Sequence, residues 1–232
     1  MNSLFVKGIK LKRDAVKNFN VYPFNIPIIK NLNEVIFNKN VTFLVGENGS
    51  GKSTIIEALA VCLKLSPEGG SAYLNFESFN STSELHNYLT IYKSAILPKW
   101  KYFLRAESFY TLANAYEQIE DSESMHIHSH GEEFLSIFET FSPQGLYLLD
   151  EPESALSPNN QIKLLCIIDQ LAKYGAQFII VTHSPILLSY RDGEIMNLDD
   201  NFKIIAYEDT EIYQTYKMFL DRHEKMQHLL FD

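Results

Sequence analysis

The chain has 232 residues, of which 46% are hydrophobic and 21% charged, a composition that excludes wholesale disorder and allows one substantial core. The formal net charge of −9 argues against tight binding along bare nucleic acid, which we expect only through a partner or a local basic patch at 7–17. No apolar run reaches the roughly 18–20 residues that span a bilayer. Cys62 and Cys166 are expected to be buried thiols of a cytoplasmic protein.

The first part of the chain predicts β-structure in several short apolar runs, at 4–6, 9–11, 35–37 and 41–45. Two prolines within 21–27 indicate a loop or an edge segment, because proline lacks the N–H that a central strand donates. Residues 66–83 are rich in Gly, Ser, Pro and Asn and read as an exposed connection. The remaining elements of this part are two helices and the strand between them, expected at 85–96 (ended by Pro98), 100–104 and 109–119.

A glycine-rich run of the form G-x-x-x-x-G-K-S stands between the apolar run 41–45 and an amphipathic stretch with helical spacing. Strand, turn and helix are the context in which such a loop wraps its backbone N–H groups around phosphates. Lysine then reaches the β- and γ-phosphates, and the following serine can bind Mg²⁺. The run therefore predicts a site for ATP and Mg²⁺ at Gly46, Glu47, Asn48, Gly49, Ser50, Gly51, Lys52, Ser53 and Thr54.

The second half alternates strands and helices, which indicates an α/β fold with a mostly parallel sheet. Continuous apolar runs at 146–149 and 178–181 are typical of strands that are buried on both faces. Ser157 and Pro158 signal a helix start, and Gly175 a helix stop. A late edge strand is expected near 204–207 and a closing helix at 210–220.

Two carboxylates, Asp150 and Glu151, follow the strand at 146–149 and so lie at the edge of the sheet where α/β proteins hold ligands. Asp150 suits the binding of Mg²⁺, directly or through water, together with Ser53. Glu151 suits the polarisation of the water that attacks the γ-phosphate. Beside a phosphate loop, this pair predicts hydrolysis as well as binding.

Residues 150–158 read D-E-P-E-S-A-L-S-P and resemble the D-E-P-T-S-A-L-D-P stretch of ABC-type ATPase domains. Taken whole, the chain resembles the small ATPases of the SMC- and RecF-like branch of that family. The resemblance implies an ABC-ATPase-like P-loop fold with helices on both sides of the sheet, an N-terminal antiparallel β part and a small helical part. It also implies that His183, in Thr182-His183-Ser184, senses the γ-phosphate and helps to orient the attacking water.

Three further roles follow from the same resemblance. Ser129-His130-Gly131-Glu132 is similar to a divergent ABC signature, which implies that Ser129 and Gly131 bind the nucleotide of the opposite subunit. Glu107 falls in the lid segment, as a metal or water contact, and Tyr22 either stacks on adenine or packs in the core. The alternation of His126, His128 and His130 leaves a zinc site open as an alternative to the signature.

We therefore expect one domain over 1–232, with 65–145 inserted between the two halves of the P-loop core. The expected function is an ATP hydrolase that acts as a dimerising switch, with nucleotide at the interface of a homodimer. One alternative is a regulatory module whose nucleotide state controls an effector partner such as a nuclease or toxin. Another is the motor subunit of a transporter, against which the missing lid glutamine and the altered signature count.

Overall fold

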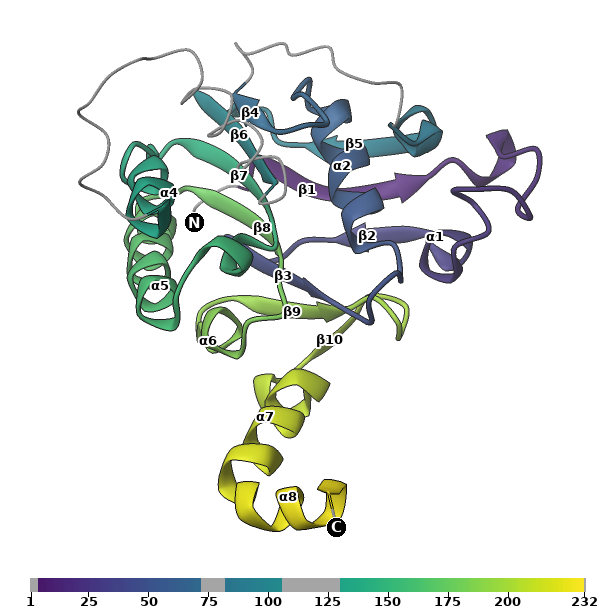
Figure 1. The fold of residues 1–232 in the computed structure, drawn as a ribbon. Coiled ribbons are helices and arrows are strands. Elements are labelled where there is room, and N and C mark those ends of the chain that lie inside the picture. Colours follow the sequence, from purple (N-terminus) through teal and green to yellow (C-terminus); the bar gives the residue numbers. More distant parts are fainter. Residues whose placement is uncertain (1–3, 72–81, 106–129, 232) are drawn as a thin grey trace, which may run out of the picture.

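Two β-sheets face each other across one helix, and this arrangement positions everything else (Figure 1). The computed structural model describes residues 4–71, 82–105 and 130–231. The smaller sheet has the order β2-β1-β5 and is antiparallel. The larger has the order β10-β9-β3-β8-β7-β6-β4, with its five central strands parallel and an antiparallel strand at each edge. The α/β fold class with a mostly parallel sheet is thereby confirmed.

The strands are β1 (Val6–Leu11), β2 (Glu34–Ile36), β3 (Val41–Val45), β4 (Gly70–Ser71), β5 (Leu89–Lys93), β6 (Trp100–Arg105), β7 (Gly145–Asp150), β8 (Gln177–Val181), β9 (Glu194–Asn197) and β10 (Lys203–Ile205). The α-helices are α1 (Pro27–Asn31), α2 (Lys52–Cys62), α4 (His130–Glu139), α5 (Pro158–Lys173), α6 (Pro185–Leu188), α7 (Glu211–Asp221) and α8 (His223–Phe231). Short 3-10 turns stand at Arg13–Ala15, Glu84–Tyr88, Pro152–Ala155 and Tyr207–Asp209.

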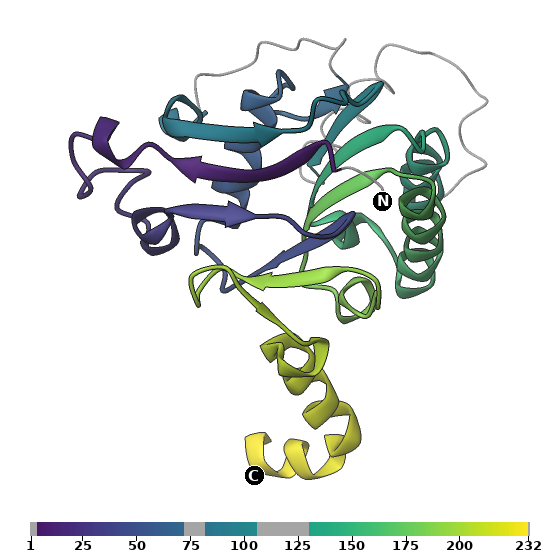
Figure 2. The same cartoon turned by 180° about the vertical axis from the view of Figure 1, so that it is seen from behind.

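The central strands are buried on both faces, as their continuous apolar runs predict. In β7, Leu146 and Leu148 face α2 and the small sheet, whereas Tyr147 and Leu149 face α4, α5 and α6. Figure 2 shows the same arrangement from behind. Because both faces are covered, ligands can reach the large sheet only at its edges and strand ends.

One buried side chain ties the two sheets together. Gln177, at the start of β8, is 1% exposed. Its Oε1 accepts from the backbone N–H of Val6 (2.9 Å) and its Nε2 donates to the Val6 carbonyl (2.7 Å). Burying an amide requires that its polar atoms find partners, so this pairing fixes where β1 begins relative to the large sheet.

The helix signals in the second half behave as the sequence predicts. The Ser157 side chain accepts from the N–H of Asn160, and Pro158 occupies the first turn of α5. Gly175 has φ 107° just after the helix, a left-handed conformation that glycine adopts without a Cβ penalty. Thr210 caps α7 in the same way, accepting from Tyr213 N–H.

Some expectations about the first part of the chain, and about the two cysteines, were wrong. The predicted helix at 85–96 is instead a 3-10 turn, Glu84–Tyr88, followed by β5, whose antiparallel pairing with β1 overrides the helical spacing of its apolar residues. The segment 21–27, predicted as a loop or an edge segment, does form turns up to Ile26, and only its last residue, Pro27, begins α1. Cys166 is exposed rather than buried, because α5 turns it away from the sheet, and Cys62 is half-buried. The predicted helix at 109–119 lies outside the described residues.

The sequence also left elements unpredicted at the C-terminal end. β9 inserts next to β3, and α8 follows α7. Both final helices project from the body (Figure 1), and neither has a buried residue. Within the described ranges, no helix combines the length and the apolarity that crossing a membrane requires.

Candidate functional site

The glycine-rich loop connects the end of β3 to the start of α2, as its sequence predicts. Gly49 (φ 76°) and Gly51 (φ 103°) are left-handed, a conformation that favours glycine. A Cβ at Gly51 would also lie 2.9 Å from Cγ2 of Ile26, in the segment before α1. The loop is therefore tightly bent, and the N–H groups of the first turn of α2 are free of helical partners, which suits an anion.

Lys52 opens α2 and is 4% exposed. Its Nζ donates to the carbonyl oxygens of Gly46 (2.8 Å) and Glu47 (2.7 Å). Burial lowers the pKa of Lys52, although Glu151, Asp199 and other nearby carboxylates act in the opposite direction. Phosphate oxygens are charged acceptors and form stronger hydrogen bonds with an ammonium than neutral carbonyls do. Lys52 is thus already folded back over the loop that is predicted to cradle phosphate.

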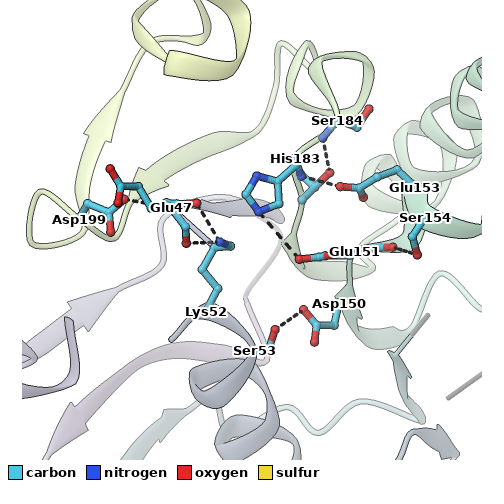
Figure 3. A network of polar contacts seen from close by, with 12 residues as sticks. Glu47, Lys52, Ser53, Asp150, Glu151, Glu153, Ser154, His183, Ser184 and Asp199 are labelled. Carbon is cyan, nitrogen blue, oxygen red and sulfur yellow. Dashed lines mark hydrogen bonds and ion pairs between the residues drawn. The ribbon is translucent and has the colours of Figure 1, made fainter. Parts of the chain in front are cut away.

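Ser53 and Asp150 lie together although 97 positions separate them. The Ser53 hydroxyl donates to Oδ1 of Asp150 at 3.2 Å (Figure 3). Asp150 ends β7 and is 5% exposed. A hydroxyl and a carboxylate oxygen are the ligand types that Mg²⁺ prefers, so the donor set fits that ion.

Glu151 and His183 face each other at the ends of the neighbouring strands β7 and β8 (Figure 3). Their Oε1 and Nε2 atoms are 3.8 Å apart. Burial lowers the pKa of His183, assisted by Lys52 and opposed by Glu151, which favours a neutral imidazole. Glu151 has φ 51°, unusual for a residue with a side chain, and strained backbone of this kind concentrates at functional sites. Its side chain is 44% exposed, so water can reach the carboxylate.

Glu153 supports the pair of Glu151 and His183, a role that the sequence pattern did not predict. Its Oε1 accepts the backbone N–H of His183 at 2.5 Å, which anchors the residue that carries the imidazole. Burial raises the pKa of Glu153 against the effect of this hydrogen bond. Within the D-E-P-E-S-A-L-S-P segment, Glu153 therefore positions His183 and does not itself face solvent as Glu151 does.

Asp199 is a second residue that sequence reasoning missed. It follows β9, and its Oδ2 accepts the N–H of Glu47 at 2.7 Å (Figure 3). A Cβ at Gly46 would lie 2.9 Å from the same oxygen, so only glycine lets the carboxylate approach this closely. Asp199 thus holds the first turn of the loop from the side opposite to Asp150.

A cavity of about 600 Å³ adjoins this turn. Its lining includes Glu47, Asn48 and His183 and, across from them, Thr210 and Glu211 at the start of α7. The start of α7 thus supplies part of the cavity wall, although it lies more than 150 positions after the loop in the chain.

The remaining predicted residues divide into two groups. Tyr22 is 60% exposed and precedes the segment that touches Gly51, so it lies on the surface and not in the core. Gly131 falls in the first turn of α4, where the backbone alone is described. Ser129 and Glu107 lie outside the described residues, as do His126 and His128. In the described part of the chain, no group of three His, Cys, Asp or Glu residues could hold a metal.

Comparisons with known proteins give one family and several distant relatives. The sequence model of a protein family described as "AAA domain" matches residues 15–177. A Methanocaldococcus jannaschii protein named an uncharacterized ABC transporter ATP-binding protein is 25% identical, over 82% of this chain and 74% of its own length. A Haemophilus influenzae protein of the same description is 25% identical over 84% and 87%. The SMC head domain from Thermotoga maritima is 18% identical, with a TM-score of 0.45 over 83% of this chain and 95% of its own.

Proposed function

Because the chain belongs to the AAA domain family, we propose that it binds ATP with Mg²⁺ and hydrolyses it to ADP and phosphate. The observation that carries the proposal is the convergence of five side chains at one edge of the sheet: Lys52, Ser53, Asp150, Glu151 and His183. These side chains supply the groups that phosphoryl transfer needs, namely a cation, metal ligands and a base that activates water.

In this proposal Ser53 and Asp150 hold the magnesium ion, which supplies charge neutralisation on the phosphates. The carboxylate of Glu151 accepts a proton from water as the water oxygen bonds to the γ-phosphorus. The bond from that phosphorus to the bridging oxygen breaks, and ADP leaves with the electron pair. Lys52 and the loop N–H groups stabilise the charge that develops on the phosphate oxygens. His183, neutral and facing Glu151, orients the water.

Titration calorimetry with ATP, and phosphate release with and without Mg²⁺, test this function directly. We expect binding that requires Mg²⁺ and turnover that stops when the ion is chelated. Glu107 and Tyr22 are proposed as additional contacts to the metal and the adenine, and their alanine variants belong in the same titrations. Absence of any ATP binding would remove the proposal.

We further propose that two copies of the chain close around the nucleotide. Each copy would be a single domain, in which segment 65–145 carries the signature residues. Ser129 and Gly131 would then bind the ATP held by the other copy. The sequence contains one phosphate loop and one signature-like segment. A second copy would therefore be needed to place a signature segment on the nucleotide from the opposite side. Such an association switch would suit a protein of the cytoplasm.

The association switch predicts that Glu151→Gln is monomeric alone and dimeric with Mg-ATP, because blocked hydrolysis leaves the nucleotide in place at the interface. Light scattering coupled to gel filtration measures the mass in both conditions. Lys52→Met serves as the control, since it should stay monomeric with ATP. A mass for Glu151→Gln that ignores ATP would contradict dimerisation while leaving ATP binding intact.

A second candidate is a regulatory module that acts through an effector protein. The observation in its favour is the set of exposed apolar side chains on the two projecting helices, at Tyr216, Met218, Phe219, Leu220, Leu229, Leu230 and Phe231. Exposed apolar clusters are typical of partner surfaces. A role as a transporter motor, which the names of the two relatives suggest for those proteins, would require a membrane-spanning partner. Copurification from the native host distinguishes the two kinds of partner.

Asp199 gives a prediction about how the loop is held. Asp199→Ala should weaken ATP binding by about tenfold, because a charge-assisted hydrogen bond to the loop backbone is lost. Asp199→Asn keeps an oxygen acceptor and removes a negative charge near the phosphates, so it should bind at least as tightly as the wild type. Calorimetric titration of both variants measures this. Equal weakening by the two variants would show that charge, and not the hydrogen bond, is what matters.

A further inference from the structure

A second cavity lies at the opposite end of α2 from the phosphate loop. It has a volume of about 240 Å³. It is bounded by residues at the end of α2, the start of β1, the end of β5 and the starts of β6 and β7. Because α2 has 11 residues, its two ends are about 16 Å apart. The cavity shares no lining residue with the phosphate loop and is therefore a separate feature.

The floor of this cavity is apolar. Phe5, Val6, Leu63 and Leu146 line it, and each is at most 8% exposed. Val6 is fixed by its two hydrogen bonds to Gln177, so this wall is rigid. Apolar floors of this kind favour the hydrocarbon part of a ligand, since burial of its surface is favourable.

The rim of the cavity is cationic. Lys64, Lys93 and Lys101 all line it, and no Asp or Glu is among the lining residues. Within the ranges that the structure describes, no carboxylate forms an ion pair with any of the three. Burial lowers the pKa of Lys101, and Lys93 and Lys64 lower it further by repulsion. A bound anion would relieve the repulsion that Lys93 and Lys64 exert on Lys101.

The three lysines do not have the same structural role. Lys101 Nζ donates to the carbonyl of Leu63 at 2.5 Å and so caps the C-terminal end of α2. Lys64 occupies the left-handed position after that helix (φ 63°), where glycine is usual. The side chains of Lys64 and Lys93 have no hydrogen bond or ion pair with the described residues. These two are therefore free to bind a ligand.

We propose that this cavity binds a small carboxylate with a short apolar tail, whose head group lies between the three lysines and whose tail packs on the apolar floor. The volume is below the roughly 300–1,000 Å³ of typical ligand pockets, so the tail must be limited to several carbons. The lysines select for the charge and the floor selects for the tail, so that neither half of the ligand alone would bind well.

Calorimetric titrations of the full chain with three probes test the proposal. Octanoate carries both features, octanamide lacks the charge, and acetate carries the same carboxylate without the tail. We expect octanoate to bind at least about tenfold more tightly than either of the others. Failure of octanoate to bind would overturn the proposal. Equal binding of octanamide would show that the lysines are not used, and equal binding of acetate would show that the floor is not used; either result also overturns it.

Variants then place the bound octanoate in the molecule. Lys64→Gln and Lys93→Gln should each weaken octanoate binding by about fivefold, because each removes one charge near the carboxylate. Both residues are exposed, so the fold should persist, and Lys101 is left intact because it caps α2. Lys163→Gln, an exposed lysine on α5, makes the same change of charge elsewhere and should bind like the wild type. Unchanged binding in both rim variants would refute the site.

Discussion

Glu151→Gln should lower the rate of phosphate release by about 100-fold or more while ATP still binds with unchanged or higher affinity. The glutamine keeps the size and one oxygen of the side chain but cannot accept a proton, and a general base contributes about 10²–10⁴-fold to such a reaction. Steady-state phosphate release at saturating Mg-ATP measures the rate, and calorimetry measures the affinity. The affinity should hold because the Glu151 carboxylate faces His183, whereas Lys52 and Ser53 are the side chains that bond to the loop carbonyls and to Asp150.

A matched control separates this effect from a general change in charge. Glu139→Gln alters an exposed glutamate at the end of α4 and should hydrolyse ATP like the wild type. If Glu151→Gln retained turnover within about threefold, Glu151 could not be the base. Loss of binding together with turnover would instead place Glu151 in the phosphate site itself and contradict the division of roles between it and Lys52.

The phosphate loop and the two acids are predictable from sequence because each is a local pattern with its own geometry. Glycines at 49 and 51 adopt the left-handed turns that the motif needs, and the apolar runs before residues 46 and 150 form buried strands. Adjacent parallel strands end at the same edge, so the pairing of β7 with β8 and of β8 with β3 brings the acids and His183 to the loop.

Asp199 could not be predicted in this way. Its role depends on β9 pairing in parallel with β3, with Asn197 opposite Val45, so that the residues after both strands meet. β9 spans only Glu194–Asn197 and has a charged residue at one end and an amide residue at the other. It therefore contains no apolar run long enough to predict a strand. The prediction of a helix where β5 forms was wrong for the same reason, a distant partner strand. The conformation of β5 is set by its pairing with β1, more than 75 positions earlier, and not by the spacing of its own apolar residues.

Lys52→Met should abolish measurable ATP binding without unfolding the protein. The ammonium is buried and its pKa is lowered by burial, so its charge is costly in the fold and is compensated by the loop carbonyls and nearby carboxylates. Methionine has a similar length and no charge to desolvate. The free energy of unfolding without nucleotide should therefore stay within about 1 kcal/mol of the wild type. Binding should fall by at least about 100-fold, because a buried cation no longer meets the phosphates.

Urea denaturation with and without Mg-ATP separates these two effects in one experiment. At 100 times the dissociation constant, ligand binding adds about 2.7 kcal/mol to the free energy of unfolding of the wild type. Lys52→Met should gain at most about 0.4 kcal/mol, because at a 100-fold weaker affinity the ligand only equals its dissociation constant. Lys163→Met, which makes the same substitution at an exposed site on α5, should gain all of the wild-type increase. If Lys52→Met gained as much as the wild type, the triphosphate would be held somewhere other than this loop, and every role assigned to Ser53, Asp150 and Glu151 would lose its basis.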